Sequence, residues 1–180
     1  MVPEDGRTGA ENSSGSDRTD CADHMWMKGD MMGILSAVCV VYMAVQGAHY
    51  AENEWLLECV LEDVERLAGC REVLILGDFN YHISELDGYT DVNGKLIIQL
   101  SENVQLEILN NSPRCEGQTT CWARRSATSI DYALASDGLV KSFSDIHIMW
   151  RAPQASGAIT IDFGWISLKP ITEGQIQNEG

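Results

Sequence analysis

The sequence predicts an α/β fold in which helices flank one mixed sheet. Two apolar runs of strand character, at 31–44 and 73–76, stand on either side of a stretch with helical spacing. The order strand, helix, strand favours parallel neighbours, because the helix returns the chain to the same end of the sheet. We therefore expect one domain at 31–170, preceded by a disordered leader at 1–30 and followed by a polar tail at 171–180.

The first apolar run has two interpretations. The β-branched centre from Val38 to Val41 is typical of a strand, at 34–43, that is covered on both faces. The alternative is a membrane anchor at 31–48, but its apolar core is shorter than the ~20 residues that cross a bilayer. Length and β-branching together favour the strand.

The remaining elements follow from apolar spacing and turn residues. Residues 52–69 predict an amphipathic helix, because apolar residues recur every three or four positions and acidic residues occupy the other face. Residues 84–94 favour turns, and 96–106 predict a second helix. We expect 119–124 and 129–136 to form a pair of strands joined by a polar turn. Further strands are expected at 106–110, 145–150 and 160–170.

The composition bears on partners and compartment. Lys and Arg total 12 against 27 Asp and Glu, which gives a formal net charge of −15. Such acidity opposes nucleic-acid binding, because Lys and Arg contacts with phosphates supply most of that affinity. The six cysteines form no CxxC pair, which favours buried thiols over a disulfide framework or a zinc site. A nuclear or cytoplasmic location is therefore favoured over a secreted or membrane one.

Three segments carry an Asp within a strand or at its end. A site that cleaves phosphodiesters needs carboxylates to hold a divalent cation and orient a base, and carboxamides to bond phosphate oxygens. Strand alternation would put Asp78 and Asn80 on one side and Phe79 in the core. Capping of the following turn is the alternative for Asp78 and Asn80, and a local hydrogen bond is the alternative for Asp131. The segments are GDFN at 77–80, SIDYALAS at 129–136 and IDFGWISL at 161–168.

Residues 34–168 resemble the endonuclease/exonuclease/phosphatase superfamily, specifically the endonuclease domain of non-LTR retrotransposons of the tick transposon type. The resemblance rests on the order and spacing of VLILGDFNYHI, DGYTDVNG, LEILNNSPRCEG, TTCWAR and SIDYALAS. It implies a DNase I-like, four-layer sandwich with two sheets between helices. It also implies metal-assisted hydrolysis of a phosphodiester in DNA, with Mg²⁺ as the usual ion.

The resemblance further implies roles for five residues. Tyr42 matches the active-site Tyr, Asp78 the Asp that orients or activates water, and Asn80 the Asn that binds the scissile phosphate. Asp131 matches the Asp that holds the catalytic His. Asp162 matches an Asp near the metal, so Asp162 is the expected metal ligand.

Two departures from the family pattern predict a degenerate site. Phe163 stands where the family has its catalytic His, and a phenyl ring can take no part in acid–base catalysis, which typically contributes ~10²–10⁴-fold. His82 and His147 do not occupy the matching position. The strands that carry the family's metal-binding Glu have no counterpart before residue 34, so we expect an N-terminally truncated domain.

Two classes of function stay open from the sequence. The first is a Mg²⁺-dependent endonuclease whose partner is DNA. The second is a non-catalytic transposon remnant or interaction module. A sheet without its partner sheet would expose apolar surface, which predicts self-association through that face. No stable membrane partner is expected.

Overall fold

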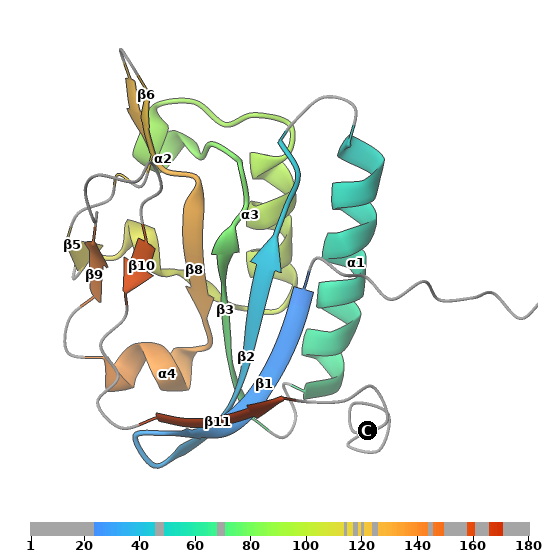
Figure 1. The fold of residues 1–180 in the computed structure, drawn as a ribbon, viewed down its shortest axis with the longest axis vertical. Helices are drawn as coiled ribbons and strands as arrows, with labels where there is room; N and C mark the ends of the chain where they lie inside the picture. The colour runs from blue at the N-terminus through green and yellow to red at the C-terminus, as the bar shows by residue number, and fades with distance from the viewer. Residues whose placement is uncertain are drawn as a thin grey trace, which may run out of the picture.

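The computed structural model describes residues 24–45, 49–67, 71–113, 115–116, 119, 121–123, 126–143, 146–149, 158–160 and 166–170. Its main feature is a six-stranded mixed sheet, seen near the centre of Figure 1. The strand order across this sheet is β11 (Ile166–Pro170), β1 (His24–Met31), β2 (Ile34–Tyr42), β3 (Glu72–Asp78), β8 (Asp131–Ala135) and β4 (Glu107–Ile108).

The strand β1 corrects the expected leader at 1–30, because residues 24–30 are part of the sheet. β1 pairs with β2 along its whole length through a two-residue turn, in which Met32 and Gly33 have φ of 56° and 84°. The polar residues of β1 conceal its strand pattern in the sequence. One of them, Asp30, accepts a hydrogen bond from the Gly33 amide at 2.7 Å and so stabilises the turn.

The strand expected at 34–43 is confirmed as β2, and its parallel pairing with β3 is confirmed as well. The connection between them contains α1 (Tyr50–Leu67), the amphipathic helix expected at 52–69. The anchor interpretation of 31–48 is wrong for its described part, because β2 is hydrogen-bonded to neighbours on both sides. Among the described residues, no helix is long and apolar enough to span a membrane.

The sheet separates two apolar cores. On one face, Cys39, Ile75 and Leu134 pack with residues of α1 and of α3 (Gly94–Asn103). On the other face, Leu74 and Ala133 pack with residues of α4 (Asp137–Ser142), which Figure 1 shows below β8. On the second face, α4 therefore covers one end of the strands. The expected site residues lie at the other end of these strands.

Two expected strands at the C-terminal side are paired differently in the structure. The expected pairing of 119–124 with 129–136 is wrong, because β6 (Cys121–Ala123) pairs with β7 (Ser126–Thr128) and β8 pairs with β3. The expected strand 160–170 is described only at its two ends, at Thr160 and at 166–170, because residues 161–165 lie outside the described ranges. β10 (Ala158–Thr160) joins a second sheet, whereas β11 joins the main one.

The second sheet and the short elements complete the fold. The second sheet has the order β10, β9 (Ile146–Met149), β5 (Cys115–Glu116), and β9 confirms the strand expected at 145–150. The helix expected at 96–106 is α3 and ends at Asn103. The strand expected at 106–110 is shortened to β4, followed by the 3-10 helix η1 (Leu109–Asn111). The turn-forming stretch contains one short helix, α2 (Ser84–Asp87).

Candidate functional site

Three of the expected site residues lie side by side on neighbouring strands. Tyr42 ends β2, and its partner in the parallel ladder is Asp78, the last residue of β3. Asp78 is also the partner of Asp131, the first residue of β8. Paired residues present their side chains to the same face of a sheet. Tyr42, Asp78 and Asp131 therefore form one row at one end of the sheet, which we call the rim row.

The rim row lies on the face that carries the second core. Side chains alternate along β3, so Asp78 shares a face with Leu74 and Leu76, both of which pack in that core. Asp78 and Asp131 are half-buried, whereas the Tyr42 side chain is 56 % exposed. The row therefore stands where the apolar core gives way to solvent, as a site for a polar substrate requires.

Asp78 has the electrostatic character of a proton acceptor. Burial raises the pKa of its carboxyl above the ordinary range, and a hydrogen bond from the Asn80 amide to Oδ1, at 3.1 Å, opposes part of that rise. A carboxylate with a raised pKa binds a proton more strongly, which suits a group that orients and activates water.

Gly77, the first residue of GDFN, is required by the approach of two strands. A Cβ atom at this position would lie 1.9 Å from the Val41 carbonyl oxygen. A side chain would therefore push β3 away from β2 immediately beside Tyr42 and Asp78, which are the next pair in the ladder.

Asn80 differs from the expected strand alternation. Phe79 is fully buried, as predicted, but β3 ends at Asp78 and Asn80 has a φ of 51°. Its Nδ2 donates to the Met43 carbonyl at 2.8 Å, while the Met43 amide donates to the Asp78 carbonyl at 2.8 Å. The Asn80 carboxamide thus ties the end of β3 to the end of β2. Its role in phosphate binding stays a prediction.

The sequence reasoning missed Asn110, which fixes the backbone of Asp131. Asn110 is buried, and its Nδ2 donates to the Asp131 carbonyl while its Oδ1 accepts from the Ala133 amide, both at 3.0 Å. These bonds continue the edge of β8 beyond the short strand β4. An Asn directly after an apolar strand was the available signal, but its partners lie 21 and 23 residues away.

The sequence reasoning also missed Asp87, which joins the two acidic segments of the rim row. Its side chain is 3 % exposed, and its Oδ2 lies 3.0 Å from Nδ1 of His82. Its Oδ1 accepts the Ser129 amide at 3.1 Å. The Tyr132 hydroxyl adds a second link, because it lies 2.9 Å from the carbonyl oxygens of both Tyr81 and Ser129.

The described residues do not provide the predicted metal site. The expected ligand Asp162 and the substituted position Phe163 both lie outside them. Within the described ranges, no cluster of three or more His, Cys, Asp or Glu could hold an ion. Asp78 and Asp131 supply two carboxylates, whereas Mg²⁺ takes six oxygen ligands in near-octahedral geometry. These two residues alone do not make a magnesium site.

The fold is that of DNase I-like proteins. The endonuclease domain of TRAS1, a telomere-specific non-LTR retrotransposon, is similar with a TM-score of 0.59 and 12 % identity, over 84 % of this chain and 64 % of that one. The catalytic domain of Xenopus laevis APE2 is similar with a TM-score of 0.50 and 17 % identity, over 82 % of this chain and 55 % of that one. At these identities the likeness concerns the fold alone.

The family follows from a match in sequence. The family model described as endonuclease-reverse transcriptase matches residues 37–156, which is 120 of the 180 residues. The chain therefore belongs to the endonuclease-reverse transcriptase family, within the endonuclease/exonuclease/phosphatase superfamily. No curated protein sequence matches it. The chain spans 64 % of the TRAS1 endonuclease domain and 55 % of the APE2 catalytic domain.

Proposed function

We propose that this chain is a retrotransposon-derived endonuclease domain whose rim row belongs to a metal-dependent site for hydrolysis of DNA phosphodiesters. The observation that supports the proposal most is the alignment of Tyr42, Asp78 and Asp131 on three adjacent strands. Family membership supplies the class of reaction.

Each described residue has a part in this proposal. Asp78, with its raised pKa, orients the attacking water and accepts its proton. Asp131, beside Asp78, matches the Asp that holds the catalytic His, a partner that this chain would regain in Phe163→His. The exposed Tyr42 hydroxyl contacts the phosphate from the other side of Asp78. Asn80 keeps the ends of β2 and β3 together. The divalent ion would be held with Asp162 and would stabilise the charge that develops on the phosphate.

The proposal includes degeneracy, because Phe163 occupies the position that matches the catalytic His. The test is nicking of supercoiled plasmid at low ionic strength, with Mg²⁺ or with EDTA, by the wild-type chain and by Phe163→His. Low salt is required because the net charge of −15 weakens contact with DNA.

We expect weak nicking by the wild type and an increase of ~10²–10⁴-fold in Phe163→His, abolished by EDTA in both. A folded Phe163→His protein that nicks no faster than the wild type would contradict the assignment of that position. Absence of Mg²⁺-dependent nicking from both proteins would leave the non-catalytic remnant as the better account.

A second candidate, a module that binds another copy of itself, is favoured by the apolar surface beside the rim row. Met25 and Val40 are paired residues of β1 and β2, and they are 52 % and 41 % exposed. Alternation puts them on the same face as Tyr42. Exposed apolar patches of this kind mark interaction sites. Sedimentation analysis of the wild type against variants of this patch tests the candidate.

A further inference from the structure

We propose that Asp87 is a positioning residue that holds the two acidic segments of the rim row in register. The catalytic consequence of this role rests on the proposed function. The contacts that Asp87 makes do not depend on any activity. The segments concerned are 78–83, which follows β3, and 129–131, which leads into β8.

A backbone hydrogen bond joins the two segments next to the acidic residues. The Phe79 amide donates to the Ile130 carbonyl at 2.8 Å. This bond continues the ladder that pairs Asp78 with Asp131, so its integrity sets the relation between the two carboxyl groups. The ladder ends there, because Asn80 leaves the extended conformation.

Asp87 reaches both segments from outside the sheet. Asp87 is the last residue of α2. Its Oδ2 contacts His82 in the first segment, and its Oδ1 accepts a hydrogen bond from the Ser129 amide in the second. A carboxylate that is 3 % exposed is costly to bury unless it is hydrogen-bonded, so these two contacts are strongly maintained. A clamp of this kind resists separation of the segments at the open end of the ladder.

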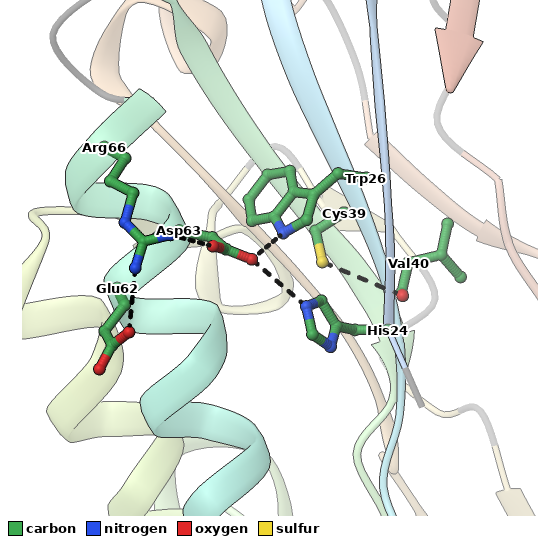
Figure 2. A network of polar contacts seen from close by, with 7 residues as sticks. All are labelled: His24, Trp26, Cys39, Val40, Glu62, Asp63 and Arg66. Carbon is green, nitrogen blue, oxygen red and sulfur yellow. Dashed lines mark hydrogen bonds and ion pairs between the residues drawn. The ribbon is translucent and has the colours of Figure 1, made fainter. Parts of the chain in front are cut away.

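A second Asp–His contact elsewhere in the fold provides a matched control. Figure 2 shows Asp63 of α1, whose Oδ2 accepts from Trp26 Nε1 at 3.0 Å and lies 3.4 Å from His24 Nε2. Its Oδ1 lies 3.5 Å from Arg66 Nη1. These partners belong to β1 and α1, and the Asp63 side chain is 15 % exposed. Loss of Asp63 therefore perturbs the fold without touching the rim segments.

The experiment measures amide hydrogen exchange in the metal-free protein, with no need for activity. The readout is the exchange rate of the Phe79 amide itself, which we expect to exchange through local opening at the end of the ladder, while the slowest core amides report global unfolding separately. The variants are Asp87→Ala, which removes both contacts, and Asp87→Asn, whose carboxamide keeps an oxygen for the Ser129 amide. Asp63→Ala is the control.

Asp87→Ala is expected to raise the exchange rate of the Phe79 amide by about tenfold or more, as loss of a buried hydrogen bond to a charged group predicts. Asp87→Asn is expected to keep the Phe79 rate near the wild-type value, and Asp63→Ala to speed exchange of the core amides while the Phe79 rate stays at the wild-type value. If Asp87→Ala does not fold, Asp87→Leu replaces it, because the Leu side chain branches at Cγ as the Asp side chain does but has no polar atom.

An unchanged Phe79 rate together with faster exchange of the core amides in the Ala or Leu variant would overturn the positioning role. Loss of protection in Asp87→Asn equal to that in Asp87→Ala would also overturn it, because charge alone would then be responsible. The nicking assay is separate. A confirmed exchange result with an inactive Phe163→His protein means that the proposed function fails while the positioning role of Asp87 stands.

Discussion

Asp78 and Asp131 are directly paired across two antiparallel strands, with their side chains on the same face of the sheet. Opposed like charges destabilise a strand pair, so a fold under no functional constraint favours other residues there. Two acids at the open end of the ladder are what the proposed cleavage site requires.

The stability of the protein should depend on the ionisation of Asp78. Its pKa is raised in the folded state, so the native protein holds this proton more tightly than the unfolded chain does. The associated stabilisation is fully present below the unfolded pKa and is lost as the pH rises through the folded pKa. Asp78→Asn cannot ionise. We expect its melting temperature, relative to the wild type, to be higher at pH 7 than at pH values below about 4.

Thermal unfolding of both proteins across the acid range checks this prediction. Asp137→Asn is a suitable control, because Asp137 is exposed and lies in α4 away from the rim row. A difference between Asp78→Asn and the wild type that does not vary with pH would show that burial of Asp78 has no energetic consequence.

Asn110 should be important for stability although it lies in a short connection. Its replacement by Ala leaves the buried Ala133 amide without this acceptor and removes a donor from the Asp131 carbonyl. We expect a loss of about 1–3 kcal/mol, measured by urea unfolding. The neighbouring exposed residue supplies the control, and Asn111→Ala should stay within about 0.5 kcal/mol of the wild type. Similar losses in the two variants would be evidence against the bridging role.

Gly77 should tolerate no side chain. The Cβ of Gly77→Ala would meet the Val41 carbonyl oxygen at 1.9 Å, and backbone cannot move aside as a flexible side chain can. We expect a loss of about 3 kcal/mol or more in urea unfolding, because β2 and β3 must separate. In Gly138→Ala the new Cβ meets only the end of the Glu72 side chain, so a small effect is expected there. A mild effect of Gly77→Ala would contradict the close approach of the strands.

Self-association should depend on the apolar surface beside the rim row. Val40→Thr, combined with Met25→Gln, keeps strand-compatible side chains and makes the patch polar. We expect the wild type to sediment as a dimer or larger species at micromolar concentration, and the double variant to shift towards monomer. Val92→Thr is the control, because Val92 is 60 % exposed but lies in the loop before α3. A wild type that is monomeric at all concentrations would remove the second candidate function.

The parts of the fold that the sequence predicted are those with uniform local patterns. The runs of β2 and β3 are apolar throughout, and α1 has an unbroken helical spacing, so each could be placed together with its parallel connection. The strand β1 was missed because Lys28, Gly29 and Asp30 interrupt its apolar pattern, and the strand depends on its neighbour β2 for pairing.

Within the candidate site, the rim row was the part that could be predicted from the sequence. Asp78 and Asp131 follow or begin recognisable strands, and the resemblance assigned each of them a role in the same site. Asp87 and Asn110 are polar residues in connecting segments, where Asp and Asn are common for local reasons. Their partners Ser129 and Ala133 are distant in sequence, so only the folded chain brings each pair into contact.

The most direct test of the account is the dependence of DNA nicking on Asp78 in a protein whose stability is not reduced. In the Phe163→His background, Asp78→Asn is expected to lower the rate of plasmid nicking with Mg²⁺ by about 100-fold or more, while its melting temperature at pH 7 is unchanged or higher. Asp137→Asn in the same background should nick at the parent rate. Equal rates for Asp78→Asn and its parent would contradict the assignment of the rim row as the cleavage site.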